Sequence, residues 1–269
     1  MNSPSASSQR RSDRLVALLA LLEERGYMPL SQLATELGAS NATIRRDVAA
    51  LARQGLLTRT HGGARPREVH GELPVELRDG RNHAVKLRIA NAAAQQIPPG
   101  RHAIGLTGGT TTAEVLRALR HRDDLTIITN SLSIGLEAAE QRQGRVLIAG
   151  GVLRSNSLEL VGPLTESTLK LVNVATAIIG ADGVSVSGGL TTHDEVEART
   201  NHTLVEHAQR VIAVVDSTKL GRKTLAKLAD LSEIDLLITD SRASQDILDD
   251  FRAVGVQVHI VPAPKGTPD

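Results

Sequence analysis

The sequence predicts a two-part α/β protein, with a winged helix-turn-helix at the amino terminus and a doubly wound domain with a parallel sheet after it. Three observations support this fold class. Three short amphipathic segments precede a glycine-containing hairpin, a stretch with two Pro and two Gly follows at 66–80, and apolar runs then alternate with helical segments as far as residue 262. The length of 269 residues is sufficient for two domains of ordinary size.

The composition argues against several classes of function. The chain has only two aromatic residues, Tyr27 and Phe251, and has neither Trp nor Cys. Proteins that grip single-stranded nucleic acids usually stack bases on aromatic rings, so this class is disfavoured. Without Cys there is no disulfide, thiolate nucleophile or Cys-ligated metal, and no apolar run approaches the length of a membrane span. We therefore expect a cytoplasmic protein that makes no contact with a membrane.

Positive charge is concentrated in one short segment. The formal net charge is only +1, but residues 41–67 contain six Arg and a single acidic residue, Asp47. A local basic footprint on an otherwise neutral chain indicates contact with nucleic acid. A solvated charged surface would have the same composition, so charge alone leaves both interpretations open.

The first 65 residues have the pattern of a winged helix-turn-helix. Residues 1–12 are polar and Ser-rich, which predicts a disordered tail. Four leucines then follow at helical spacing, namely Leu15, Leu18, Leu19 and Leu22. After Gly26, a second helix is expected at Gln32–Leu37 and a third at Asn41–Gln54, each preceded by a serine that can cap it. Leu56–Arg65 predicts two strands joined by a Gly-Gly turn.

The predicted third helix presents its basic residues away from its packing face. Ile44, Val48 and Leu51 form its apolar stripe, and Arg46 and Arg53 point nearly opposite that stripe. In a winged helix-turn-helix this helix enters the major groove of DNA. We therefore assign residues 13–65 to a DNA-binding domain. A three-helix cap that arginines keep soluble is the alternative.

A domain boundary is expected at 66–80, where Pro, Gly and charged residues predict a linker of little intrinsic structure. We expect residues 81–262 to form the second domain and 263–269 to form a tail.

The second domain contains seven apolar runs, which predict buried parallel strands. They are His102–Leu106, Leu125–Thr129, Arg145–Ala149, Ala175–Gly180, Val211–Asp216, Ile234–Thr239 and Val256–Val261. The helices expected between them are Ala113–Leu119, Leu132–Ala139, Leu164–Leu171, Val196–Ala208 and Gln245–Phe251.

The ends of these strands predict the ligand, because doubly wound sheets bind ligands at the carboxyl ends of their strands. Thr107-Gly108-Gly109-Thr110-Thr111-Thr112 leads from the first strand into a helix, and its amides and hydroxyls suit a phosphate. A tight turn with a threonine cap would use the same residues, so the loop alone leaves both interpretations open. The polar residues that follow later strands suit a phosphorylated polyol, and they are Asn130, Asp182, Asp216 and Lys219.

A cluster of histidines beside acidic residues does not have the spacing of a metal site. His202 and His207 are five residues apart, so a helix does not place both on one face. We interpret this segment, which also includes His193, as a solvated helix. We expect no metal and no cofactor.

The motifs occur in an order that resembles the DeoR family of bacterial transcriptional regulators over residues 12–262. The most specific are Thr43-Ile44-Arg45-Arg46-Asp47 and His61-Gly62-Gly63-Ala64, and they are followed by Gly109-Thr110-Thr111, Thr129-Asn130, Gly150-Gly151 and Asp216-Ser217-Thr218-Lys219. The resemblance implies a winged helix-turn-helix that binds double-stranded operator DNA, joined to a Rossmann-like, ribose-5-phosphate-isomerase-like α/β sensor domain. It also implies a repressor of sugar-catabolic genes that a phosphorylated sugar relieves, and a homo-oligomer of two or more copies.

The resemblance assigns two sets of residues. Those that would face DNA are Ser40, Asn41, Thr43, Arg45, Arg46, Arg59, His61 and Arg65. Those that would bind the effector are Gly108, Gly109, Thr110, Thr111, Thr112, Asn130, Asp182, Glu197, Asp216 and Lys219. One departure concerns the residue before the loop, which is commonly Asp in the family and is Thr107 here. The identity of the effector therefore does not transfer from a relative.

The sequence also predicts that the protein is not an enzyme. The related isomerases need an acid and a Lys in the loop after the fourth strand to transfer a proton, and the corresponding loop here, 183–189, has neither. Such a pocket would bind a sugar phosphate without converting it. A sugar-phosphate isomerase or deaminase with an appended helical domain is the alternative.

Overall fold

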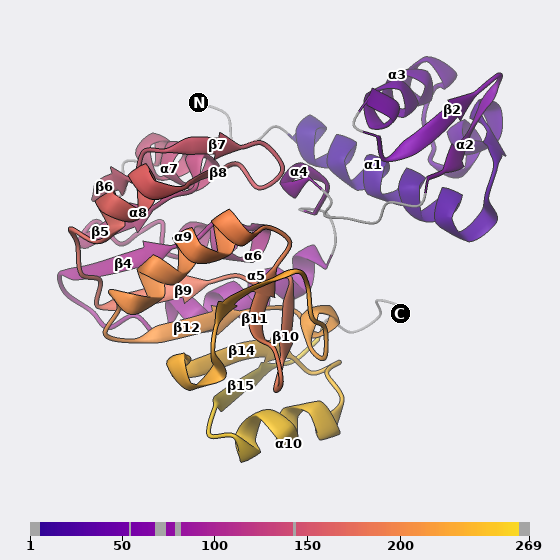
Figure 1. The fold of residues 1–269 in the computed structure, drawn as a ribbon. Coiled ribbons are helices and arrows are strands. Elements are labelled where there is room, and N and C mark those ends of the chain that lie inside the picture. Colours follow the sequence, from indigo (N-terminus) through magenta and orange to yellow (C-terminus); the bar gives the residue numbers. More distant parts are fainter. Residues whose placement is uncertain (1–5, 54, 68–73, 79–81, 142–143, 264–269) are drawn as a thin grey trace. The chain divides into compact units, whose positions relative to one another are not determined.

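The chain forms two compact units, Met1–Arg81 and Asn82–Asp269, which Figure 1 shows as ribbons. The computed structural model describes residues 6–53, 55–67, 74–78, 82–141 and 144–263. Each unit has its own hydrophobic core, so each is described by itself.

The first unit is the predicted winged helix-turn-helix. Its elements are α1 (Ala6–Arg25), β1 (Met28–Pro29), α2 (Leu30–Glu36), α3 (Asn41–Arg53), β2 (Leu57–Thr60) and β3 (Gly63–Pro66). The three strands form an antiparallel sheet in the order β1-β3-β2. Leucines of α1 and α2 pack against the Ile44, Val48 and Leu51 stripe of α3, and all three stripe residues are fully buried. The apolar spacing of α3 therefore fixes which of its faces meets solvent.

The predicted tail is shorter than expected, because α1 begins at Ala6 and residues 6–12 are helical. Residues 1–5 lie outside the described residues. A polar composition predicts disorder when the segment stands alone. Here the buried leucines of the following turns nucleate the helix, and each residue added at its end then gains a backbone hydrogen bond at little further cost in entropy.

The predicted linker is also partly structured. A single helical turn, α4 (Val75–Arg78), lies within 66–80, and Leu77 is buried in the core of the first unit. Two apolar residues, Val75 and Leu77, are enough to dock the turn in spite of the Pro and Gly around it. The rest of the interval, 68–73 and 79–81, lies outside the described residues.

The second unit is built on a parallel sheet of seven strands in the order β15-β14-β12-β9-β4-β5-β6. All seven predicted apolar runs are strands of this sheet, with ends that differ from the prediction by at most two residues. Their bounds are β4 (His102–Leu106), β5 (Leu125–Thr129), β6 (Arg145–Ile148), β9 (Thr176–Ile179), β12 (Val211–Val214), β14 (Leu236–Asp240) and β15 (Gln257–Val261).

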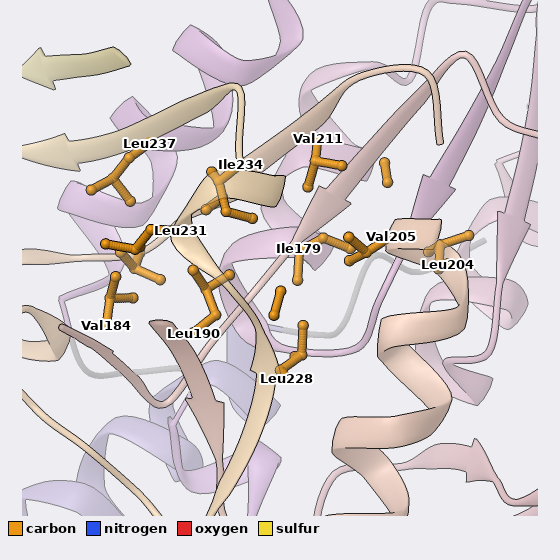
Figure 2. Packing of buried hydrophobic residues seen from close by; sticks show 14 of the residues in the cluster. Ile179, Val184, Leu190, Leu204, Val205, Val211, Leu228, Leu231, Ile234 and Leu237 are labelled. Atoms are coloured by element: carbon orange, nitrogen blue, oxygen red, sulfur yellow. The ribbon is translucent and has the colours of Figure 1, made fainter. Parts of the chain in front are cut away.

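Helices cover both faces of this sheet. One core contains α5 (His83–Ala94), α6 (Thr110–Ala118) and α7 (Leu132–Glu140), and the other contains residues of α8 (Pro163–Leu169), α9 (Glu195–Glu206) and α10 (Gln245–Ala253). Neighbouring strand residues serve opposite cores, as Ile178 and Ile179 of β9 do. Figure 2 shows the second core, where Leu204 and Val205 of α9 approach Ile179 and Val211.

Several short elements have no clear signal in the sequence. A hairpin of β7 (Val152–Arg154) and β8 (Glu159–Val161) follows β6, and a small antiparallel sheet joins β10 (Gly183–Ser185), β11 (Gly189–Thr192) and β13 (Ala226–Ala229). Two 3-10 turns, η1 (Ser217–Lys219) and η2 (Leu231–Glu233), complete the unit. These strands are short and have polar or small residues in place of a continuous apolar run, so they lack the signal that predicts the strands of the main sheet.

The strand order places one loop pair at the centre of the sheet. The chain runs from β4 outward to β5 and β6, then returns to the other side of β4 with β9. In doubly wound sheets such a reversal opens a crevice at the carboxyl ends of the two central strands. The loops after β4 and β9 are therefore the expected place for a ligand.

Replacement of the one buried aromatic side chain tests this packing. Phe251 on α10 is fully buried, so Phe251→Ala should lower the free energy of unfolding by about 3–5 kcal/mol. Leu171→Ala, at a side chain that is 85% exposed, is the control and should change it by less than about 0.5 kcal/mol. Urea denaturation followed by circular dichroism would measure both. Equal stabilities of the two variants would contradict the described core.

Candidate functional site

The structure exposes the residues predicted to face DNA. Of the eight, only Thr43 is half-buried, and the other seven are exposed: Ser40, Asn41, Arg45, Arg46, Arg59, His61 and Arg65. They lie at the start of α3 and on the β2–β3 hairpin, which is the wing. In this fold both parts are positioned to touch a DNA duplex.

Two of these residues also build the start of α3. The Ser40 hydroxyl accepts a hydrogen bond from the Thr43 amide at 3.2 Å, and the two hydroxyls lie 2.8 Å apart. Ser40 is therefore the helix cap that the sequence predicts. At α2 the corresponding prediction is wrong, because the residue before the helix is Pro29 and Ser31 lies inside the helix.

The two wing arginines project from opposite faces of the hairpin. In the β2–β3 register Arg59 lies opposite Ala64, whereas Arg65 lies opposite Thr58. Residues that face each other across an antiparallel pair share a face, and faces alternate along a strand. Arg59 and Arg65 therefore do not act as one pair, although both are exposed.

Asp47, the last residue of the Thr43–Asp47 motif, has a structural role for which the sequence predicts no partner. It is 3% exposed, and its carboxylate accepts a hydrogen bond from the Arg14 guanidinium at 2.7 Å. Arg11 lies 3.7 Å from the other carboxylate oxygen. This buried ion pair ties α3 to α1, so it orients the helix whose first turn carries the predicted DNA-contacting residues. A lone acid among six arginines was the available signal.

The second candidate site begins at the loop after β4. Gly109 adopts φ +120°, a conformation that L side chains rarely take, and α6 begins at the next residue. Thr111 and Thr112 are buried, and the Thr112 hydroxyl donates to the Gly109 carbonyl at 2.8 Å. The loop is thus a glycine turn with a helix amino terminus behind it, and Thr112 stabilises the turn from within.

Thr107, at the position where the family commonly has Asp, connects the two central loops. Its side chain is 1% exposed, and its hydroxyl accepts a hydrogen bond from the Gly180 amide at 3.2 Å. The same hydroxyl lies 3.4 Å from the Gly108 carbonyl. The hydroxyl joins the ends of β4 and β9 and is turned toward the backbone.

The structure brings Asp182, Glu197 and Lys219 into one polar network. The Lys219 ammonium lies 3.3 Å from the Asp182 carboxylate. The Thr192 hydroxyl lies 3.3 Å from Asp182 and 2.6 Å from the Glu197 carboxylate. Asp182 and Lys219, which follow β9 and β12, are therefore paired directly, and Thr192, which was not predicted, connects Asp182 to Glu197 of α9.

Asp216 has a local role in positioning Lys219. It is buried and precedes the turn η1, and one of its carboxylate oxygens accepts hydrogen bonds from the amide and hydroxyl of Thr218 within that turn. Asp240 at the end of β14 accepts from the Ser217 amide at 2.7 Å and from the Arg242 guanidinium at 2.8 Å. Burial alone would raise the pKa of Asp240, but these hydrogen bonds outweigh it and lower the pKa. Two carboxylates thus hold the turn that carries Lys219.

Glu159 of β8 reaches the loop after β4 and was not predicted. Its carboxyl oxygen Oε1 accepts hydrogen bonds from the Gly108 amide at 2.6 Å and from the Asn201 side chain at 3.2 Å. Burial, together with the neighbouring Glu197 carboxylate, raises the pKa of Glu159 well above its ordinary value. Asn130 joins the same network by donating to Asn201 at 2.9 Å.

Arg154 of β7 adds a positive charge to this network. Its guanidinium lies 3.0 Å from the Glu197 carboxylate and 3.1 Å from that of Asp194. The four-residue step from Glu197 to Asn201 was a readable signal, because it puts both on one face of α9. Glu159 and Arg154 had none, since they lie in short strands.

One other concave surface lies outside this network. A surface hollow lies at the opposite edge of the sheet, at the amino ends of β4, β5 and β6, and its lining includes Arg101, Asp123 and Arg145. Within the described residues, no group of three His, Asp or Glu side chains is placed to hold a metal ion. None of the helices described has both the length and the apolar composition needed to cross a membrane.

A substitution at Asp47 tests its role in the first unit. Asp47→Asn should lower the stability of that unit by about 1.5–3 kcal/mol, because a charged hydrogen bond to Arg14 is lost. Glu36→Gln is the matched control, since its pair with Arg25 is exposed and screened by solvent and should contribute little to stability. Thermal unfolding of the two variants, followed by the NMR signals of backbone amides in α1 and α3, measures the difference in stability of the first unit. A loss no larger than that of the control would show that the ion pair does not join the helices.

Comparison with known proteins covers both units. Residues 14–68 match the model of the DeoR-like helix-turn-helix domain, and residues 81–241 match the model of the DeoR C-terminal sensor domain. The putative aga operon transcriptional repressor of Escherichia coli O157:H7 is 34% identical over 268 residues, which cover 97% of this chain and 99% of that protein. The glycerol-3-phosphate regulon repressor of Escherichia coli K12 is 31% identical and covers 86% of this chain and 92% of its own length.

Among solved structures, ribose 5-phosphate isomerase A from Methanocaldococcus jannaschii aligns with 52% of this chain and 55% of its own, at a TM-score of 0.40 and 21% identity. That score is too low to bear on function. The two family models together match more than half of the chain, and the relatives match nearly all of it. The chain therefore belongs to the DeoR family, and it is a transcriptional regulator rather than an enzyme, as the sequence predicted.

Proposed function

We propose that the protein represses genes of sugar catabolism by binding operator DNA, and that a phosphorylated sugar relieves the repression. The observation that carries the proposal is the pairing of two sites in one chain. One unit exposes arginines on a recognition helix and a wing, and the other places a glycine turn before a helix amino terminus at the centre of its sheet. The relatives' names, which mention the aga operon and the glycerol-3-phosphate regulon, support this reading.

The first site suits the DNA duplex. The first turn of α3 would enter the major groove with Asn41, Arg45 and Arg46, and the wing would reach the backbone with Arg59, His61 or Arg65. A single recognition helix reads one half-site, and a symmetric pair reads two, so we propose a homo-oligomer of at least two copies. An operator-binding regulator of this kind would act in the cytoplasm.

The second site suits a phosphate joined to a polyol. The amides of Gly108–Thr112 would bind the phosphate, and Lys219 would add a positive charge. Asp182 and Glu197 would accept hydrogen bonds from sugar hydroxyls. Asn130 supports this assignment, because its buried side-chain oxygen Oδ1 accepts no hydrogen bond from the residues that the structure describes.

Relief of repression requires that the effector distinguish two arrangements of the protein. A ligand shifts an equilibrium only by its difference in affinity for the two states, which is typically about 1–3 kcal/mol for coupled sites. The deciding experiment is a mobility-shift titration of the purified protein on DNA from its own promoter, with a panel of sugar phosphates added. No sequence-specific shift would refute the DNA-binding function, and a shift that no sugar phosphate reverses would refute the assigned effector class.

Loss of a recognition-helix arginine should weaken operator binding. Arg46 is exposed on α3, and Arg46→Ala should cost about 1–3 kcal/mol of binding free energy if the guanidinium reads a base edge. Arg252→Ala, on α10 of the second unit, removes the same charge and is the control. Fluorescence anisotropy with labelled operator at fixed salt compares them. The assignment fails if the two variants bind alike.

Loss of Lys219 should uncouple the response from DNA binding. Lys219→Ala should bind operator like the unmodified protein but need a higher effector concentration for release, because a phosphate or hydroxyl partner is lost. The control is Lys227→Ala. Lys227 is an exposed residue of β13, and it pairs with Asp230. Titration of the effector against the protein–operator complex gives the midpoint of release. An unchanged midpoint would remove Lys219 from the site.

A further inference from the structure

The phosphate-type loop already has an anion-like partner of its own. Glu159 approaches Gly108 so closely that a Cβ atom added at Gly108 would lie 2.5–2.7 Å from the glutamate side chain. Its oxygen Oε1 accepts from the Gly108 amide at 2.6 Å. This amide is one of those that the proposed function assigns to the effector's phosphate. Glu159 and a bound phosphate would therefore compete for the same donor, the Gly108 amide.

The rest of the Glu159 environment specifies which form of its carboxyl group is held there. Oε1 takes hydrogen bonds from two N–H donors, those of Gly108 and Asn201. The Glu197 side chain lies beside Glu159 and itself accepts hydrogen bonds from Arg154 and Thr192. Burial and the nearby Glu197 carboxyl group both raise the pKa of Glu159, so the closed site favours its neutral form.

The position of Glu159 depends on the hairpin that carries it. Glu159 lies opposite Arg154 in the β7–β8 register, and it forms an isolated bridge with Ser131 at the end of β5. The preceding residue, Leu158, has a φ of +55°, which is unusual for a leucine and sets the entry of β8. The amide of Leu160 donates to the Asn130 carbonyl at 2.7 Å. Movement of Glu159 away from Gly108 would therefore disturb the hairpin and its contacts with the end of β5.

We propose that Glu159 is a built-in competitor for the effector's phosphate, which holds the Gly108 amide in the ligand-free protein and must leave it when a phosphate binds. The proposal rests on the proposed effector site. Its consequence is that Glu159 sets the affinity and selectivity of the loop, since only a ligand that binds the loop better than this side chain can displace it. It also links occupancy of the loop to the position of the β7–β8 hairpin.

Displacement carries a proton with it. The charged and titratable groups that face Glu159 are Glu197 of α9, with Arg154 of β7 behind it, and the network extends through Thr192 to Asp182 and Lys219. Burial and the Glu197 charge raise the pKa of Glu159 in the closed site. Once displaced toward water, the carboxyl group returns toward its ordinary pKa, its O–H bond breaks, and the proton passes to the buffer. Phosphate binding is therefore favoured as pH rises between these two pKa values.

Three variants separate the parts of the proposal. Glu159→Gln keeps an acceptor for Gly108 and a donor for Glu197 but has no proton to release. Glu159→Ala removes the competitor. Glu166→Ala is the control, because that carboxylate lies on α8 and pairs with Arg199 instead of the loop.

The first measurement uses no ligand. Hydrogen exchange of the Gly108 amide, followed by NMR, should be slow in the unmodified protein, in Glu159→Gln and in Glu166→Ala. In Glu159→Ala it should be faster by about tenfold or more, because the amide loses its acceptor. Equal exchange in all four proteins would overturn the proposal, whatever the effector.

The second measurement is calorimetric titration with inorganic phosphate at pH 7.5, in two buffers of different ionisation enthalpy. The unmodified protein and Glu166→Ala should release a proton on binding, and Glu159→Gln should not. This comparison subtracts the ionisation of phosphate itself, and it remains valid if Glu159→Ala fails to fold. Glu159→Ala should bind phosphate about fivefold or more tightly than the unmodified protein, since no internal competitor remains.

The outcomes distinguish this proposal from the proposed function. If phosphate binds all the proteins with equal affinity and equal proton release, the loop is a phosphate site and the role of Glu159 is wrong. If phosphate and sugar phosphates bind none of them, the effector site itself is wrong, and the competitor falls with it. Operator binding in the mobility-shift assay is unaffected by either result.

Discussion

The reversal of strand order between β4 and β9 is the constraint on which the second unit's chemistry depends. Because β5 and β12 flank these two strands, the carboxyl ends of four neighbouring strands carry the loop after β4, Asn130, Asp182 and Asp216. None of these residues is close to another in sequence. The parallel hydrogen-bond ladder alone brings them to one edge, and the close contact of Gly105 with Leu204 of α9 keeps a helix directly against the sheet beneath them. A site assembled in this way is only as rigid as the ladder under it.

Buried carboxylates hold the parts that act. Asp47 fixes the recognition helix against α1, Asp240 fixes the turn that carries Lys219, and Glu159 occupies the loop at the centre of the sheet. The first two are satisfied by arginine and backbone donors. Glu159 lies instead beside a second carboxylate. A buried acid next to another acid is costly to keep, and such costs are often found at functional positions.

Most long apolar patterns were predictable from the sequence, although the twelve-residue helix α5 was not predicted. The seven strands of the main sheet lie in continuous apolar runs, the helices of the first unit have a helical period, and the two family models confirm the family that the resemblance indicated. The short elements that were missed lack both signals. The β7–β8 hairpin has three residues a strand, and the turn α4 depends on the tertiary burial of Leu77. Glu159 interacts with Gly108 across 51 positions of sequence, which no local pattern reports.

The two aromatic residues are divided between the units, and this has an optical consequence. Tyr27 lies at the end of the first unit's α1–β1 connection, and a Cβ atom added at Gly63 of the wing would lie 2.5 Å from its ring. With no Trp in the chain and Phe251 buried in the second unit, ultraviolet emission above that of phenylalanine comes from Tyr27 alone. The fluorescence of Tyr27 therefore reports on the base of the wing without any added label. It does not report on the interior of the second unit.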